Sequence, residues 1–344
     1  MPRVLYCVSP IGLGHATRAS AVAAILRERG VDVLLASGGN ASVFLKSLGL
    51  PTVDLIRLPT PSVGGGSMKW ASVWYAKYWM GYRRSKTRIG RLMESLHPDL
   101  VVGDEEFSCI SLALEKGLRH ALVTDELELG FARSFIARSI ESRVSKWYAD
   151  LLSKSALVII PDEGQDSGNI KHVGPIVRKV TKTRDDVLDE FRIPKDGYVV
   201  LLSLSGSGIG GHLLGLVRGG IEDCGVAPVS FVVTGNRGRR IEGAGIHDLG
   251  VVRDNQNLVA AADVVISNAG KSTIDEAASA GSPIIPIPIR YHAEQERNAS
   301  SAGYVRGLEV HLGSAIRNKI GRRAPPLTFK GSERTSQLLL SMLG

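Results

Sequence analysis

Short apolar runs that end in glycine-rich turns alternate along this 344-residue chain with segments whose apolar positions have helical spacing. The first cycle has an apolar run at 4–9, a glycine-rich turn at 11–15 and a helical pattern that ends near Gly30, and a second apolar run follows at 31–36. A buried strand, a glycine turn, a helix and a second strand are typical of the βαβ units that build a parallel sheet. The pattern therefore predicts an α/β fold.

The same rhythm occurs in both halves of the chain. In the first half we expect further strands at 100–103, 121–124 and 157–160, with a helix at 110–115. In the second half we expect strands at 198–203, 229–234, 251–252, 264–267 and 284–287. These elements predict two doubly wound domains, at 1–172 and 173–323, and a tail at 324–344 whose short helix could pack back on the first domain. Ligands of such sheets bind beyond the carboxyl ends of the strands, so we expect the site in the cleft between the domains.

Composition and charge narrow the class of protein. Hydrophobic residues make up 44% and charged residues 22%, which excludes a disordered or fibrous chain. The 42 Lys and Arg outnumber the 34 Asp and Glu, and the net charge of +8 favours an anionic partner such as a nucleotide, a phospholipid or a nucleic acid. Cys7, Cys109 and Cys224 lack metal-ligand spacing, so neither a zinc site nor a disulfide framework is expected. No apolar stretch approaches the roughly 20 residues of a membrane span and no signal peptide is recognised, so we expect a cytoplasmic protein.

Two glycine-rich turns of the second half resemble nucleotide-binding motifs without matching them. Residues 206–211 fit G-x-G-x-x-G after a strand, but the next strand ends in Gly235-Asn236-Arg237, where a dinucleotide-binding chain has an acidic residue for the ribose. Gly270-Lys271-Ser272 would suggest a Walker A motif, but Val265 stands where that motif has a glycine. Each turn can still close backbone amides on phosphate oxygens at a helix N-terminus, or serve as a structural turn alone.

The second turn opens a longer motif. Gly270-Lys271-Ser272-Thr273-Ile274-Asp275-Glu276-Ala277 is followed by the pairs Glu294-Gln295 and Asn298-Ala299, and Gly12–Arg18 forms a G-x-G-H loop in the first half. With these motifs the chain resembles the GT-B glycosyltransferases, above all the UDP-glycosyltransferases and the MurG-type N-acetylglucosaminyltransferases (family 28 C-terminal domain). The resemblance implies two facing Rossmann-like domains with a deep cleft, and a nucleotide-sugar donor held by the second domain.

Donor-binding roles follow from this resemblance. It implies that a loop at 205–208 binds the diphosphate, that Glu276 holds the ribose, and that the backbone near Val252-Arg253 faces the uracil, while Glu294-Gln295 bind hydroxyls of the donor sugar. The donor-binding residues that it implies are Gly14, Ser205, Gly206, Ser207, Gly208, Val252, Arg253, Asn268, Gly270, Lys271, Ser272, Thr273, Glu276, Glu294 and Gln295. Relatives often carry a basic residue in place of Asn268, and Lys271 could supply that charge.

His15 resembles the catalytic base of the same family. A hydroxyl that attacks an anomeric carbon must lose its proton, and a neutral imidazole suits this task near pH 7. Asp104, at the end of an expected strand, aligns with the aspartate that orients this histidine in many relatives, and such a partner stabilises the imidazolium that forms. Two alternatives stay open: His15 could be a structural residue of its turn, and Asp104 could cap the helix that begins near Ser108.

An aromatic and basic stretch lies outside the family motifs. Residues 67–93 contain no Asp or Glu, and their Trp and Tyr residues fall at helical spacing among Lys and Arg. The residues that we single out here are Trp70, Trp74, Trp79, Arg83 and Arg84. Such a stretch suits a lipid headgroup interface, but an aromatic stripe can equally belong to a core; no nucleic-acid-binding module accompanies it. Asp125-Glu126, after another expected strand, could bind acceptor hydroxyls or cap a helix.

The resemblance implies a reaction and leaves two alternatives. We expect an inverting, metal-independent transfer of a hexose or N-acetylhexosamine from a UDP-sugar to a hydroxyl acceptor, which could be lipid-linked and presented at the inner face of the cell membrane. No metal or cofactor is expected beyond the UDP-sugar substrate. The alternatives are a nucleotide-sugar epimerase of the same fold, which would act on the donor alone, and a non-catalytic protein that binds a nucleotide sugar or a glycolipid.

Overall fold

The computed structural model describes residues 1–60, 62–64, 67–69, 71–125, 135–204, 212–236, 240–289, 292–304 and 311–344. The chain forms two compact units, and the first is discontinuous in sequence. The first unit contains Met1–Pro61, Trp70–Val177 and Phe329–Gly344, and the second contains Ser62–Lys69 and Arg178–Thr328.

The first unit is built on a seven-stranded sheet in which every described pair of neighbouring strands is parallel. Its strand order is β3-β2-β1-β6-β7-β8-β9. The strands are β1 (Arg3–Val8), β2 (Asp32–Ser37), β3 (Thr52–Asp54), β6 (Leu100–Asp104), β7 (His120–Val123), β8 (Leu157–Ile160) and β9 (Ile170–His172). The helices are α1 (Gly14–Glu28), α2 (Gly39–Ser47), α3 (Ala71–Leu96), α4 (Phe107–Glu115), α5 (Phe135–Lys154) and α12 (Gly331–Ser341).

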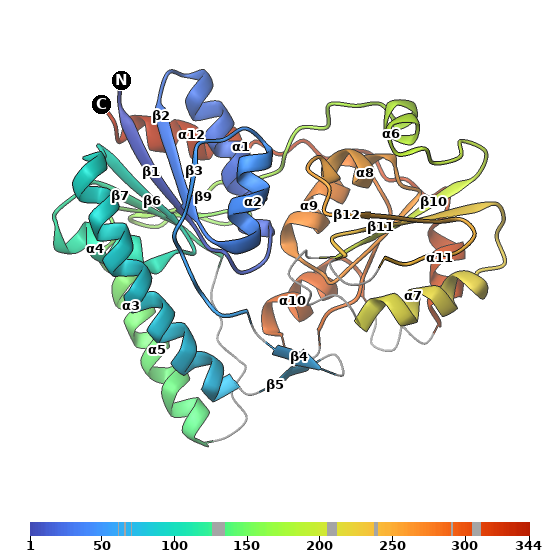
Figure 1. Ribbon diagram of the computed structural model, residues 1–344, viewed down its shortest axis with the longest axis horizontal. Coiled ribbons are helices and arrows are strands. Elements are labelled where there is room, and N and C mark those ends of the chain that lie inside the picture. Colours follow the sequence, from blue (N-terminus) through green and yellow to red (C-terminus); the bar gives the residue numbers. More distant parts are fainter. Residues whose placement is uncertain are drawn as a thin grey trace. The chain divides into compact units, whose positions relative to one another are not determined.

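Both faces of this sheet are covered, which explains why its central strands are apolar without interruption. Side chains alternate along β1: Val4 and Tyr6 enter a core formed with α1, α2 and α12, while Leu5 and Cys7 enter a second core formed with α3, α4 and α5. Figure 1 shows these two groups of helices on opposite faces of the sheet. The tail helix α12 packs against α1, and its Leu339 is fully buried.

The second unit has a five-stranded sheet of the order β12-β11-β10-β13-β14, again with every described pair parallel. Its strands are β10 (Tyr198–Ser203), β11 (Val229–Thr234), β12 (Ile246–Gly250), β13 (Val264–Ser267) and β14 (Ile284–Pro286). The helices are α6 (Arg184–Phe191), α7 (His212–Glu222), α8 (Asn255–Ala261), α9 (Lys271–Ala280), α10 (Ala293–Ser301) and α11 (Leu312–Lys319). One core lies against α7 and α11 and the other against α6, α8 and α9. A short antiparallel pair, β4 (Ser62–Gly64) and β5 (Ser67–Lys69), also belongs to this unit.

The prediction of two doubly wound α/β domains is confirmed, but one expected strand was wrong. Residues 251–252 follow the edge strand β12 and are not part of it. Sequence reading missed β12 because its residues are only half buried and polar ones alternate with apolar ones. One of the polar residues, Asp248, accepts hydrogen bonds from the side chain of Asn236 and from the backbone N–H of Ile241. An edge strand of this kind lacks the continuous apolar run that marks a strand buried on both faces.

Each sheet has one point where the strand order reverses, and ligands of open α/β sheets bind beside it. In the first unit this point lies between β1 and β6, so the segments after these strands carry His15 and Glu105. In the second unit it lies between β10 and β13, and the turn Asn268–Gly270 follows β13. The fold therefore places both expected sites at the ligand-binding edges of their sheets.

Candidate functional site

His15 is held at both ring nitrogens by carboxylates of the first unit. Gly12 has a φ of 79°, a left-handed conformation that glycine adopts without strain, and α1 begins two residues later. His15 consequently lies in the first turn of α1. Its Nδ1 is 3.2 Å from Oδ1 of Asp104, and its Nε2 is 3.3 Å from Oε2 of Glu105. The predicted contact between His15 and Asp104 is thus present, and Glu105 is an additional partner that the sequence reading missed.

A buried arginine binds the same carboxylate. Arg18 follows His15 by three positions, so both side chains lie on one face of α1. The guanidinium donates from Nη2 to Asp104 (2.7 Å) and from Nη1 to Asp125 (2.9 Å), and only 6% of the Arg18 side chain is exposed. Sequence reasoning also missed Arg18, although its spacing from His15 in the G-x-G-H loop could have indicated it. The structure brings His15, Asp104 and Asp125 together as one ionic cluster.

The charges of this cluster determine the protonation of His15. Burial alone lowers the pKa of the ring, but the attraction of Glu105 and the hydrogen bond to Asp104 outweigh burial and raise the pKa of His15 to about 9. For Asp125 burial acts in the opposite direction and raises the pKa of the carboxyl group. The attraction of Arg18 and His15 outweighs burial and lowers this pKa overall. In this arrangement His15 is an imidazolium at pH 7, and not the neutral ring that the sequence suggested.

Glu106 takes the capping role that had been considered for Asp104. Its Oε1 accepts a hydrogen bond from the backbone N–H of Ser108 (3.1 Å) at the start of α4. Burial raises the pKa of Glu106 to about 7, although the bonds from Ser108 lower it in part. The alternative that Asp104 caps this helix is therefore wrong. The Asp104 carboxylate instead contacts His15 and Arg18.

The expected phosphate turn of the second unit lies at the N-terminus of α9. Gly270 is the N-cap residue of this helix, whose positive dipole end favours an anion. The side chain of Asn268 is buried beside the turn, and within the part of the chain that the structure describes neither its Oδ1 nor its Nδ2 has a hydrogen-bond partner. Because unpaired buried amides are costly, Asn268 is suited to a ligand. Lys271 bonds Asp275 at 2.8 Å, so its charge is shared with that carboxylate.

Glu276 is held by an arginine that the sequence reading did not single out. Arg178 Nε donates to Glu276 Oε1 at 3.0 Å, and Arg178 Nη1 donates to the backbone carbonyl of Arg253 at 2.7 Å. Arg178 thereby connects the predicted ribose glutamate with the backbone predicted to face the base. Its only sequence signal was its place in the segment 174–178, which joins the two expected domains.

The pair Glu294-Gln295 lies in the first turn of α10. Oε1 of Gln295 accepts from the backbone of Ile289 (3.0 Å), and Nδ2 of Asn298 donates to Glu294 (3.5 Å) and to the carbonyl of Ala269 (3.3 Å). Asn298 thus ties the pair to the phosphate turn, so the structure brings these two predicted parts of the donor site together. The predicted site residues Ser205, Gly206, Ser207, Gly208, Glu126 and Trp70 lie outside the described residues.

The aromatic stretch on α3 is divided between core and surface. Tyr75 and Tyr82 are buried, whereas the side chains of Trp79 and Met80 are each 51% exposed. Trp74 is partly buried and donates from its indole to the carbonyl of Pro59 (2.9 Å). Basic residues of α3 that are exposed with Trp79 are Lys77, Arg83, Arg84, Arg88 and Arg91. The core interpretation therefore holds for Tyr75 and Tyr82. The lipid-interface interpretation stays a prediction for the exposed side of the helix.

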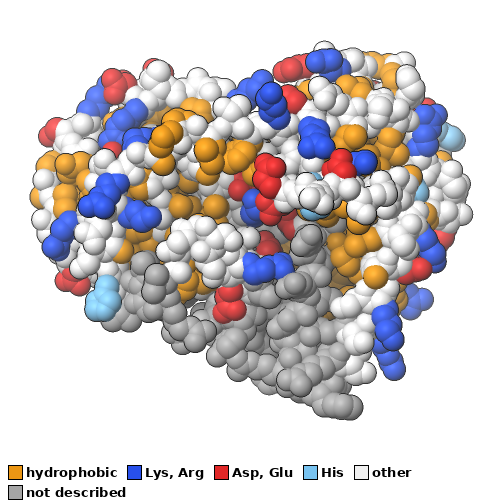
Figure 2. All heavy atoms as spheres, turned by 180° about the vertical axis from the view of Figure 1, so that it is seen from behind, with side chains coloured by type: hydrophobic (Ala, Val, Ile, Leu, Met, Phe, Trp, Pro, Cys, Tyr) orange, Lys and Arg blue, Asp and Glu red, His pale blue; other side chains and the backbone are white. Residues whose placement is uncertain are grey.

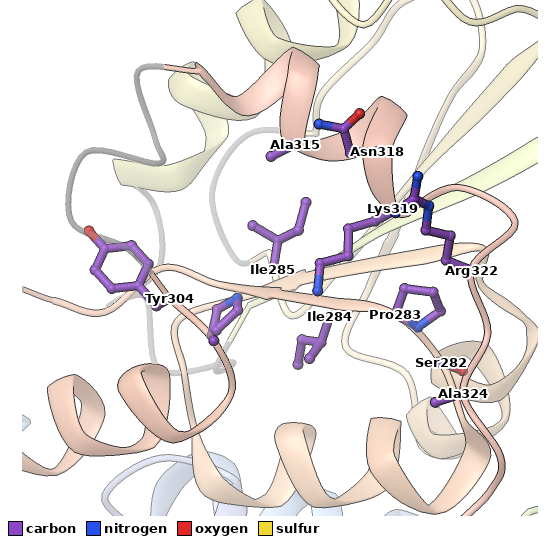
Figure 3. A pocket seen from close by; sticks show the side chains of 12 residues that line it. Ser282, Pro283, Ile284, Ile285, Tyr304, Ala315, Asn318, Lys319, Arg322 and Ala324 are labelled. Carbon is purple, nitrogen blue, oxygen red and sulfur yellow. The ribbon is translucent and has the colours of Figure 1, made fainter.

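A cavity in the second unit lies apart from the predicted site residues. On the face shown in Figure 2, Lys and Arg side chains are spread among hydrophobic and uncharged ones. A cavity of about 520 Å³ in the second unit is lined by β14 and the C-terminal part of α11, and Lys319 extends into it opposite Tyr304 (Figure 3). None of the predicted site residues lines this cavity. Within the described parts, no group of three or more His, Cys, Asp or Glu side chains could hold a metal ion, and no helix is long and apolar enough to cross a membrane.

Comparison with known proteins identifies the fold and the class of enzyme. Residues 242–315 match the glycosyltransferase family 28 C-terminal domain, and this segment contains Asn268, Glu276 and Gln295. An uncharacterized glycosyltransferase of Methanopyrus kandleri is 25% identical over 267 residues, which cover 71% of this chain and 76% of that protein. The crystal structure of a glycotransferase of kitacinnamycin superposes with a TM-score of 0.64 at 15% identity and covers all of both chains. The chain has the GT-B fold and is a glycosyltransferase.

A further relative of the transferase has a more specific name. A UDP-N-acetylglucosamine--N-acetylmuramyl-(pentapeptide) pyrophosphoryl-undecaprenol N-acetylglucosamine transferase of Methylorubrum populi is 24% identical over 321 residues, covering 88% of this chain and 81% of that protein. The solved structures establish the fold of the transferase, whereas the family model and the sequence relatives establish its class of activity.

Proposed function

We propose that the transferase moves a hexose or N-acetylhexosamine from a UDP-sugar to a hydroxyl acceptor, with inversion at the anomeric carbon and without a metal ion. The observation that carries this proposal is the imidazole of His15, held by Asp104 at the ligand-binding edge of the first sheet. UDP-N-acetylglucosamine is the donor in the name of the Methylorubrum populi relative, which supports a uridine nucleotide. Independence from metal follows from the resemblance to GT-B relatives.

In the proposed reaction His15 acts as the general base. The acceptor oxygen forms a bond to the anomeric carbon from the face opposite UDP while its proton passes to Nε2 of His15. The bond from the anomeric carbon to the phosphate oxygen breaks, and UDP leaves with the electron pair. Asp104 stabilises the imidazolium formed in this step, and the positive end of α9 stabilises the charge on the leaving diphosphate.

Glu276 provides a test of the donor site. Replacing it by glutamine should weaken UDP binding about tenfold or more, because a hydrogen bond to a charged group contributes roughly 1.5–3 kcal/mol. If the carboxylate holds the ribose diol, the loss should be smaller for 2′-deoxy-UDP, which lacks one hydroxyl. Isothermal titration calorimetry with both nucleotides measures the difference.

The matched control for this test is Glu190→Gln, which removes a carboxylate that pairs with Lys182 at the surface of the same unit. Thermal unfolding of both variants shows whether loss of the Arg178 pair has changed the fold. Equal losses for UDP and its 2′-deoxy form would contradict a ribose-binding role for Glu276, and unchanged binding of both would exclude it from the donor site.

The proposed acceptor is lipid-linked and is met at an anionic membrane surface. The exposed Trp79 and Met80, among basic residues on α3, combine an apolar anchor with charges that attract phospholipid headgroups. The double variant Trp79→Ser, Met80→Ser should bind vesicles containing phosphatidylglycerol at least about tenfold less tightly. Fully burying one such side chain contributes roughly 1.5–3 kcal/mol, and about half of that remains to be gained by each of these two half-exposed residues. Co-sedimentation with vesicles measures the affinity.

Val43→Ser is the control for membrane binding, since Val43 is an exposed apolar residue of α2 in the same unit. Its vesicle affinity should equal that of the unmodified transferase. An unchanged affinity of the double variant would remove α3 from the membrane contact and leave the acceptor proposal without its structural support.

A further inference from the structure

Glu105 occupies the nitrogen of His15 that the reaction needs. Asp104 takes Nδ1, so Nε2 is the atom available to an acceptor hydroxyl, and Oε2 of Glu105 lies 3.3 Å from it. The other oxygen, Oε1, accepts from the backbone N–H of Asp125 at 3.3 Å and lies 4.0 Å from Nη2 of Arg18. Glu105 is therefore fixed in the ionic cluster.

The backbone explains how two successive carboxylates reach one ring. Successive side chains of a strand point to opposite faces of the sheet, so Asp104 and Glu105 would diverge if β6 continued. Glu105 instead has a φ of 46°, a left-handed conformation that is unusual for a residue with a side chain, and its N–H bonds the carbonyl of Val123. This turn brings the second carboxylate back to His15, and such strained positions concentrate at functional sites.

The contacts also define which protons the ring carries. The Asp104 carboxylate accepts a hydrogen bond from Nδ1, and the negative charge of Glu105, 3.3 Å from Nε2, favours a proton on that nitrogen as well. That ring is the imidazolium, which cannot accept the proton of an acceptor hydroxyl. The arrangement is consequently a resting state of the proposed base.

We propose that Glu105 is a positioning residue that keeps His15 protonated between turnovers and yields its place at Nε2 to the acceptor hydroxyl. This inference rests on the proposed role of His15 as the base. The proton on Nε2 passes to Oε2 of Glu105, which leaves a neutral ring and a neutral carboxyl group. The acceptor then displaces that carboxyl group, and Nε2 takes the acceptor proton as the bond to the anomeric carbon forms. The proton on Glu105, whose side chain is 18% exposed, is released to solvent.

The groups around His15 indicate that Glu105 is the residue that keeps the ring protonated. Among the residues that the structure describes, the charged groups that face the ring are Asp104, Glu105, Arg18 and Asp125. Burial raises the pKa values of Tyr6 on β1, Tyr78 on α3 and Tyr148 on α5, so these phenols stay neutral at physiological pH. Among the interactions that raise the pKa of His15, the attraction of Glu105 is the largest.

The test is a histidine titration by NMR on the full chain labelled at its histidines, with His15→Gln to assign the signal. The midpoint of His15 should lie near pH 9 in the unmodified transferase and fall by at least one unit in Glu105→Gln. Glu105→Gly is the second variant, because glycine tolerates the left-handed backbone and also removes the carboxylate. Glu28→Gln makes the same charge change at the far end of α1 and should leave the midpoint unchanged.

Transfer kinetics complete the test. The acidic limb of kcat/KM should move to lower pH with the midpoint, and transfer at pH 7 should rise at least threefold in Glu105→Gln. An unchanged midpoint of the His15 titration in both Glu105 variants overturns the proposal. A shifted midpoint with an unchanged acidic limb of kcat/KM overturns it as well. Failure of the proposed function is distinguishable, because it appears as undiminished transfer by His15→Gln whatever the Glu105 variants show.

Discussion

Replacing His15 by glutamine lowers kcat for sugar transfer about 10²- to 10⁴-fold, the usual contribution of a general base, and leaves the affinity for UDP unchanged. Glutamine keeps a polar side chain of similar reach but cannot accept the acceptor proton. The nucleotide is expected to be bound by Asn268, Glu276 and their neighbours in the second unit, which the substitution does not touch. Steady-state transfer from a radiolabelled UDP-sugar measures kcat, and calorimetry measures UDP binding.

His97→Gln is the matched control, since His97 is an exposed histidine of the same unit. Its kcat should equal that of the unmodified transferase. If His15→Gln retained full transfer, the base assignment would be wrong, and conversion of the UDP-sugar in the absence of any acceptor would favour the epimerase alternative.

Replacing Arg18 by methionine is expected to lower the free energy of unfolding of the first unit by about 3–5 kcal/mol. Arg18 and Asp104 are both buried, and the guanidinium also bonds Asp125. Methionine fills a similar volume but removes the guanidinium from Asp125 and leaves Asp104 with His15 as its cationic partner. Chemical denaturation followed by tryptophan fluorescence measures the loss.

Two further variants separate the ionic effect from packing. Arg27→Met changes an exposed arginine of the same helix and should cost less than about 0.5 kcal/mol. Adding Asp125→Asn to Arg18→Met removes one of the stranded charges and should recover part of the stability. A loss in Arg18→Met no larger than in Arg27→Met would show that the cluster does not stabilise the unit.

Much of the fold could be predicted from the sequence because strands covered on both faces must be apolar throughout. The runs that became β1, β6, β10 and β13 were found for this reason. The edge strand β12 was missed because half-buried strands mix polar and apolar residues. The helix α3 was seen only as a stripe of aromatic residues, and its division into a buried and an exposed side depends on α4 and α5, which pack against it.

The candidate site was predictable only where local motifs determine it. His15 follows the turn between β1 and α1, Asp104 ends β6, and the order of the strands brings the two residues together as expected. Glu105 and Arg178 could not be assigned, because the position of Glu105 depends on one left-handed backbone angle and that of Arg178 on a contact across 98 residues. The diphosphate loop at 205–208 stays a prediction.

The discontinuous first unit has a consequence for how the chain is made. The helix α12 completes the core beneath α1, yet it is synthesised after every residue of the second unit. During translation the second unit can therefore fold on the ribosome while the apolar side of α1 still lacks part of its cover. Nascent chains that stall before α12 would expose that surface to chaperones, and the helix that carries His15 acquires its full packing only after α12 has been made.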